Sequence, residues 1–138
     1  MTRPPTLRVA RPTNQLSQIA RMYCEGLECS VLASFTDHDG FDGTIVGRPG
    51  EAYHLEFTRR RGRGTTETPD GDHLLVFYEP DSERWEDCCS RLVRAGFRVV
   101  RSVNPFWDRQ GRTFEDLDGY RIVVQNSEWR PETISRRE

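Results

Sequence analysis

The sequence has few sulfur-containing residues, no excess of charge of one sign and no long hydrophobic run. It contains 4 cysteines in 138 residues, and no two of them have C-x-x-C spacing. We therefore expect reduced thiols that serve as small core residues, which is typical of cytoplasmic proteins. The formal net charge is -2, so no basic field indicates a nucleic-acid partner. No apolar run approaches the roughly 20 residues that cross a bilayer.

Signals for export and for several enzyme classes are also missing. Residues 1–6 contain no apolar segment, so no secretory signal is predicted and a cytoplasmic location is expected. No nucleophile elbow, phosphate-cradling glycine loop or dinucleotide fingerprint occurs. The 35% of hydrophobic residues and the length of 138 residues indicate one globular domain with a single sizeable core.

Two amphipathic helices are predicted from the spacing of their apolar residues. The first places Leu16, Ile19, Ala20, Tyr23 and Leu27 on one face, with Thr13 or Asn14 as its N-cap and Gly26 at its end. The second places Trp85, Cys88, Cys89, Leu92 and Val93 on one face, with Asp81 or Ser82 as its N-cap and Gly96 at its end. Side-chain oxygens at a helix start and glycine at its end are the usual helix boundaries.

Short strand-like segments surround both helices in the same order. Each helix follows one strand, at 7–10 and 74–78, and precedes three more, at 30–35, 44–46 and 53–58 and at 97–101, 113–115 and 120–125. The order β-α-β-β-β therefore occurs twice, as an internal repeat. We expect a single domain over residues 1–138, with module 1 at about 6–58, a linker at 59–72, module 2 at about 73–126 and a polar tail at 127–138.

The basic run at residues 59–64 lies in the expected linker. It has the sequence Arg-Arg-Arg-Gly-Arg-Gly and allows two interpretations. It could contact an anion or RNA, but acidic residues elsewhere cancel its charge. We interpret it as a solvated, flexible connection between the modules.

Three segments resemble the superfamily of glyoxalases, bleomycin-resistance proteins and dioxygenases, known as the vicinal oxygen chelate superfamily. The segment 53–58 (YHLEFT) resembles its fourth strand, 73–77 (HLLVF) its fifth strand, and 114–122 (FEDLDGYRI) its final hairpin. The stretch 104–108 (NPFWD) is similar to the YycE-like branch. The resemblance covers residues 7–126. It implies an α+β fold in which two βαβββ modules form an open, cup-shaped mixed sheet, as in dihydroxybiphenyl dioxygenase.

The same resemblance implies a metal site with four positions, on the first, fourth, fifth and eighth strands. In this sequence those positions are occupied by Arg8, Glu56, His73 and Val123. An arginine stays protonated and has no acceptor atom, and a valine has no donor atom. We therefore expect the usual metal site to be absent, and no cofactor is expected.

Two alternatives remain for the polar residues of the cup. His54 and Glu56 are two residues apart in a strand and should share a face. Together with His73 they could hold iron or zinc, as in a metal-dependent lyase, isomerase or dioxygenase. In the other alternative, Arg8 pairs with Glu56 and no metal is needed, because the pairing offsets the desolvation of both charges.

Strand alternation extends the set of residues expected to face the cup. On the fifth strand it selects His73, Leu75 and Phe77, and on the eighth Arg121, Val123 and Gln125. Leu7 and Val9 should face a helix. Trp107 precedes the seventh strand, where it would stack on a ligand or anchor its loop.

Two functions follow from this set. The first is an enzyme in which Glu56 or His73 moves a proton while Arg8 steadies the developing charge. The second is a non-catalytic protein that sequesters a small molecule, with Arg8, His54, Phe77, Trp107 and Arg121 as the binding residues. The resemblance implies a homodimer. The expected partner is a small-molecule ligand or substrate, and neither nucleic acid nor a membrane is expected.

Overall fold

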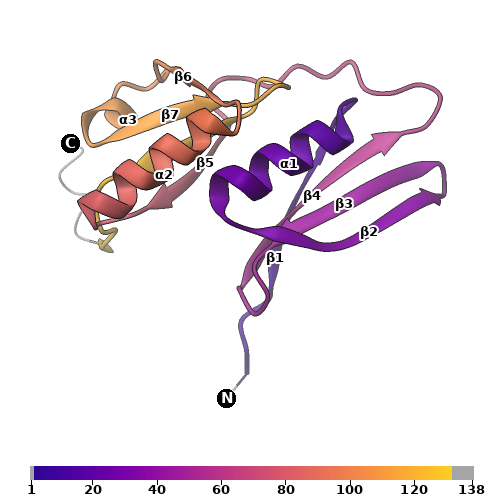
Figure 1. The fold of residues 1–138 in the computed structure, drawn as a ribbon, viewed down its shortest axis with the longest axis horizontal. Helices are drawn as coiled ribbons and strands as arrows, with labels where there is room; N and C mark the ends of the chain where they lie inside the picture. Colours follow the sequence, from indigo (N-terminus) through magenta and orange to yellow (C-terminus); the bar gives the residue numbers. More distant parts are fainter. Residues whose placement is uncertain (1, 132–138) are drawn as a thin grey trace. The chain divides into compact units, whose positions relative to one another are not determined.

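The computed structural model describes residues 2–131, and it divides into two compact units at Thr68. Each unit contains one strand, a long helix and three further strands (Figure 1). The predicted α+β class and the twofold βαβββ repeat are confirmed. Among the described residues no helix is both long and apolar enough to cross a membrane. Residues 132–138 of the expected polar tail lie outside the described residues.

The first unit is a four-stranded sheet with one helix packed on it (Figure 1). Its elements are β1 (Leu7–Pro12), α1 (Leu16–Leu27), β2 (Ser30–His38), β3 (Phe41–Gly47) and β4 (Tyr53–Arg60). The strand order is β1-β4-β3-β2, with β1 parallel to β4 and the other pairs antiparallel. Ile19 and Tyr23 of α1 pack with Val46, Leu55 and Phe57, all of which are buried. This core covers one face of the sheet.

The second unit repeats the arrangement and adds a short helix. Its elements are β5 (Leu74–Tyr78), α2 (Ser82–Arg94), β6 (Arg98–Val100), α3 (Phe106–Arg109), β7 (Gly111–Glu115) and β8 (Arg121–Gln125). The strand order is β5-β8-β7-β6, and β5 is parallel to β8. The core between α2 and the sheet contains Trp85, Cys89, Leu92, Phe114, Ile122 and Val124.

The helix boundaries differ from the prediction in α1 and agree with it in α2. The helix α1 continues through Gly26, and Glu28 takes the left-handed conformation that ends it, with φ 53°. Thr13 accepts a hydrogen bond from the Gln15 amide just before the helix. In α2, Asp81 is the N-cap and accepts a hydrogen bond from the Arg84 amide at 3.0 Å.

Two apolar residues expected in the core are exposed. Leu7 is 61% exposed, because β1 is an edge strand and Leu7 is its first residue. Val93 is 52% exposed at the last turn of α2. The helical and strand periods were correct, but each residue lies at the margin of its packed face.

Residues of the basic run form an ordered cluster around a buried carboxylate. Asp42 accepts hydrogen bonds from the Asp37 amide at 2.9 Å, from Arg59 at 2.6 Å and from Arg61 at 2.9 Å. The Asp37 amide, followed by the two guanidinium groups, lowers the pKa of Asp42 to about 2. Arg59 also belongs to β4. The expected linker therefore begins after β4, which ends at Arg60, and the side chains of Arg59 and Arg61 bind Asp42.

The depressed pKa of Asp42 predicts how the stability of the protein depends on pH. A carboxyl group whose pKa falls on folding stabilises the protein above its unfolded pKa, and this contribution is lost as pH falls through the folded pKa. The melting temperature of the wild type should therefore fall between about pH 4 and about pH 2 as Asp42 is protonated. Asp42→Asn should melt several degrees lower at pH 7 and lose part of this acid transition, as measured by circular dichroism.

Asp39→Asn provides the control for that experiment, because Asp39 is an exposed turn residue whose carboxylate lies 3.9 Å from the His38 ring nitrogen. It should leave both the melting temperature and its pH dependence close to the wild type. Equal pH profiles for Asp42→Asn and the wild type would contradict the role assigned to Asp42.

Candidate functional site

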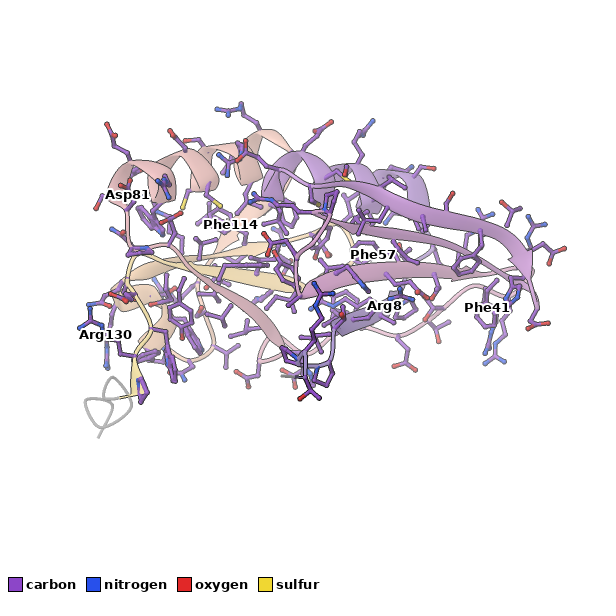
Figure 2. All side chains as sticks on the ribbon, turned by 90° about the horizontal axis from the view of Figure 1, so that it is seen from below. Arg8, Phe41, Phe57, Asp81, Phe114 and Arg130 are labelled. Carbon is purple, nitrogen blue, oxygen red and sulfur yellow. The ribbon has the colours of Figure 1, made fainter. Side chains whose placement is uncertain are left out.

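The polar residues of β1 and β4 lie on the face of the first sheet away from α1. Leu55 and Phe57 are buried on the α1 side, so alternation turns His54 and Glu56 to the opposite side. Arg8 pairs in register with His54 and therefore shares its face. Figure 2 shows Arg8 and Phe57 on opposite sides of the sheet. We call this side, with Arg8, Ile45, His54 and Glu56, the distal face.

On the distal face Arg8 connects His54 to Glu56. Its Nε donates to Nδ1 of His54 at 3.1 Å, and its Nη1 donates to Oε1 of Glu56 at 3.0 Å. The Arg8 side chain is 46% exposed and that of Glu56 is 17% exposed. The predicted pairing of Arg8 with Glu56 is confirmed, and His54 extends it.

This network determines which atoms remain available to a ligand. Because Nδ1 of His54 accepts a hydrogen bond, the proton of the neutral ring is on Nε2, which can donate. Within residues 2–131 the three side chains form no other hydrogen bond or ion pair. The remaining guanidinium N–H groups, Nε2 of His54 and Oε2 of Glu56 can therefore bind polar atoms of a small molecule.

Apolar residues lie next to this polar group. Ile45 of β3 pairs with Glu56 and shares its face. The ring of Phe35 covers Gly43, where a Cβ atom would lie only 2.1 Å from the ring. Leu32 is 38% exposed and lies near Gly47 on the same side. A few directed polar groups beside an apolar wall are the usual composition of a small-molecule site.

The second sheet shows that two of the predicted site residues were misplaced. The pairing of β1 with β4 ends at Pro12 and Thr58, and that of β5 with β8 ends at Tyr78 and Gln125. In each pair, the residue that follows the first strand donates its amide to the carbonyl of the last paired residue of the second strand, at 2.8 Å. Arg8 lies four residues before Pro12, and Leu74 lies four residues before Tyr78, so Leu74 occupies the position of Arg8 in the second sheet. Glu56 lies two residues before Thr58, and Val123 lies two residues before Gln125, so Val123 occupies the position of Glu56.

His73 therefore lies outside the strand and one residue before the position at which it was expected. Its amide donates to the Asp70 carbonyl in a turn, and its side chain is exposed. The same register puts Phe77 level with Val124, on the face that α2 covers, whereas Arg121 is level with Leu74 on the other face. The prediction that His73 and Phe77 share a face with Arg121 is wrong, because the turn includes His73 and shifts the alternation by one residue.

Arg121 and Trp107 have defined local partners in the second unit. Arg121 donates to Glu115 at 3.1 Å, and Arg98 binds the same carboxylate. Burial raises the pKa of Glu115, but the hydrogen bonds from Arg98 and Arg121 outweigh it and hold the pKa below the ordinary value. Gln125 donates to the carbonyl of Trp107 at 3.0 Å, which anchors the loop before β7. A stacking role for Trp107 stays a prediction.

The residues at the four positions of the superfamily's metal do not fit such an ion. These positions contain Arg8, Glu56, Leu74 and Val123, of which only Glu56 has a ligand atom. The guanidinium of Arg8 already binds that carboxylate. Across residues 2–131, no group of three or more His, Cys, Asp or Glu side chains is arranged to hold a metal. Nδ1 of His54, a residue of the predicted substitute set, binds Arg8.

Comparison with known sequences identifies the family. Sequence profiles of the YycE-like N-terminal and C-terminal domains match residues 7–58 and 72–126. The uncharacterized protein YycE of Bacillus subtilis is 46% identical over 121 residues, which are 88% of this chain and 87% of YycE. The chain belongs to the YycE-like family. The predicted similarity of the chain to the YycE-like branch is thereby confirmed.

Solved structures show the same fold. The crystal structure of YycE from Bacillus subtilis, a protein of unknown function suggested to be a glyoxalase/fosfomycin resistance protein, has a TM-score of 0.84, 44% identity and coverage of 91% of this chain and 92% of YycE. Glyoxalase I of Leishmania major has a TM-score of 0.69 at 14% identity, with coverage of 98% and 92%. The antibiotic-binding protein TnmS3 of Streptomyces has a TM-score of 0.58 at 22% identity, with coverage of 91% and 97%.

Proposed function

We propose that this YycE-like protein binds a small, oxygen-bearing molecule on the distal face, by direct contact with Arg8, His54 and Glu56 and without the divalent metal of its superfamily. The observation that carries the proposal is the position of Arg8, whose guanidinium donates to both His54 and Glu56. A cation at the first metal position takes the place that a ligand to the ion would need.

The geometry favours ligands with carbonyl or carboxylate oxygens. Two fixed hydrogen bonds orient the Arg8 guanidinium before a ligand arrives, which reduces the entropy lost on binding. A planar guanidinium binds such oxygens in pairs. Because Glu56 offsets the charge of Arg8, the site also suits a neutral molecule, and Leu32, Phe35 and Ile45 offer contact to its carbon skeleton.

A catalytic function is the second candidate, and it rests on Glu56. One oxygen of this carboxylate binds Arg8, while the other is available to accept a proton from carbon next to a substrate carbonyl. The Arg8 cation would then stabilise the negative charge on the substrate oxygen. Binding of a compound without its turnover would instead support a binding function; TnmS3, which shares the fold, is an antibiotic-binding protein.

The first experiment is a thermal-shift screen of small carbonyl and carboxylate compounds, with hits measured by calorimetry. Arg8→Gln should weaken binding of a hit by at least about tenfold, because it removes charge-assisted hydrogen bonds. Arg21→Gln, an exposed arginine on α1, should leave the affinity unchanged. Equal affinities for wild type and Arg8→Gln would refute the proposed site.

Metal content separates the proposal from the metal-dependent alternative. Untagged protein analysed by inductively coupled plasma mass spectrometry should contain far less than one equivalent of transition metal. A near-stoichiometric metal that is lost in both His54→Ala and Glu56→Ala would instead establish a substitute metal site. In our proposal the protein is located in the cytoplasm and acts as a homodimer. Light scattering on the purified chain tests its oligomeric state.

A further inference from the structure

A pocket lies at the carboxyl end of β4, beside the basic run. It has a volume of about 310 Å³, and its lining includes Phe41, Thr58, Arg60, Arg63, Thr65 and Glu67. Thr58 and Arg60 continue the alternation of His54 and Glu56, so the pocket opens on the distal face. Thr58 follows Glu56 by two residues, a distance of about 7 Å along a strand. A molecule bound at Glu56 would therefore lie beside the Thr58 wall of this pocket.

The four arginines of the basic run divide into two kinds. Arg59 and Arg61 bind the carboxylate of Asp42, and the carboxylate of Asp37 lies 3.9 Å from Arg61, so two negative charges offset these two cations. Arg60 and Arg63 both line the pocket. In the part of the chain that the structure describes, neither of these two has a carboxylate within 4.0 Å. The pocket therefore contains two guanidinium groups whose charge is not compensated by an ion pair.

The turn that carries this pocket is fixed by the first unit itself. The side chain of Asn14 donates to the carbonyl of Thr65 at 2.8 Å and accepts from its amide at 2.9 Å. Gly64 has a φ of +68°, and a Cβ atom there would lie 2.7 Å from Oδ1 of Asn14. The guanidinium of Arg60 lies 5.5 Å from the centre of the Phe41 ring, which orients it. The Thr65 backbone and the Arg60 guanidinium are thus held in place before a ligand arrives.

We propose that this pocket binds an oxyanion group, a phosphate, phosphonate or carboxylate, of the molecule that the distal face takes up. This inference rests on the proposed function for the identity of the rest of the ligand. Arginine donors in a fixed position match oxyanions in pairs of hydrogen bonds. The hydroxyl of Thr65 accepts from the Glu67 amide, so its hydrogen can point at an anion. Two guanidinium groups outnumber the one carboxylate of the lining, Glu67, and together with the hydroxyl they favour a group with three or more oxygens.

The test measures binding of inorganic phosphate and of acetate to the full chain by ¹H–¹⁵N NMR at constant ionic strength. Phosphate should shift the amides of Gly64, Thr65 and Thr66 in a saturable way, and acetate should bind more weakly. Arg60→Gln or Arg63→Gln should weaken phosphate binding by at least about tenfold, because each removes charge-assisted hydrogen bonds.

The matched control is Arg59→Gln, which removes the same charge one residue away but on the other face of β4. Phosphate affinity should stay within about twofold of wild type in this variant. If Arg59→Gln lost as much phosphate affinity as Arg60→Gln, net charge alone would explain the effect and the proposal would be overturned. The absence of saturable shifts at residues 64–66 would also overturn it. Because Arg8→Gln does not alter this pocket, failure of the Arg8 experiment and failure of this one can be told apart.

Discussion

Replacing Phe57 by alanine is expected to lower the free energy of unfolding by about 3–5 kcal/mol. Phe57 is 2% exposed, and the centre of its ring lies 4.8 Å from the centre of the Tyr23 ring. Tyr23 is fully buried. Alanine would leave a cavity between α1 and β4 that the surrounding residues fill only in part. Because alternation along β4 couples the two faces, packing of Phe57 also holds His54 and Glu56 on the distal face.

Urea denaturation followed by circular dichroism measures this effect. Val31→Ala is the control, because Val31 is 55% exposed and should change stability by no more than about 0.5 kcal/mol. A loss below about 1 kcal/mol for Phe57→Ala would show that α1 and β4 do not pack as described.

Trp85→Ala should have a similarly large effect in the second unit, about 3–5 kcal/mol. The indole is 9% exposed, its Nε1 donates to the carbonyl of Val124 at 2.9 Å, and the guanidinium of Arg112 lies 4.6 Å from its ring. Alanine removes the apolar contact of α2 with the sheet and leaves a buried carbonyl without its donor.

Two variants distinguish these contributions. Trp85→Phe retains most of the apolar contact and loses the hydrogen bond, so a cost of about 1–2 kcal/mol is expected. Trp129→Ala changes a tryptophan that is 47% exposed and should cost less than about 1 kcal/mol. If Trp85→Phe were as damaging as Trp85→Ala, the hydrogen bond rather than the packing would dominate.

A difference of one residue in the register of β5 explains why His73 and Phe77 do not lie where the sequence predicts them. His73 was expected to face the cup because a histidine followed by four apolar residues resembles the fifth strand of the superfamily. The turn closed by the amide of His73 on Asp70 delays the strand to Leu74. A shift by one residue places every side chain of a strand on the opposite face from the expected one. Phe77 therefore lies on the α2 face and not on the face of Arg121. Only strand pairing reveals such a shift.

The contacts of the basic run could not be predicted for a different reason. Residues 59–64 have the composition of a solvated linker, and composition carries no information about distant partners. The partner of Arg59 and Arg61 is Asp42, in the preceding hairpin, and that of Thr65 is Asn14, before α1. The two partners of each contact are 17 to 51 residues apart in the sequence. These contacts hold Arg59 and Arg61 in a structural cluster, whereas Arg60 and Arg63 line the pocket that we propose for an oxyanion.

The sequence alone was sufficient to establish the α+β class, the repeated βαβββ order and the positions of both long helices, because the periods of 3.6 and 2 residues are local properties of the chain. It also determined that Arg8 and Val123 cannot be metal ligands, because this follows from residue chemistry alone. Tertiary structure decided which residues meet: that Arg8 binds both His54 and Glu56, that His73 lies outside the strand, and that the basic run divides around Asp42. Register and long-range pairing depend on the packing of whole elements, and no local pattern encodes them.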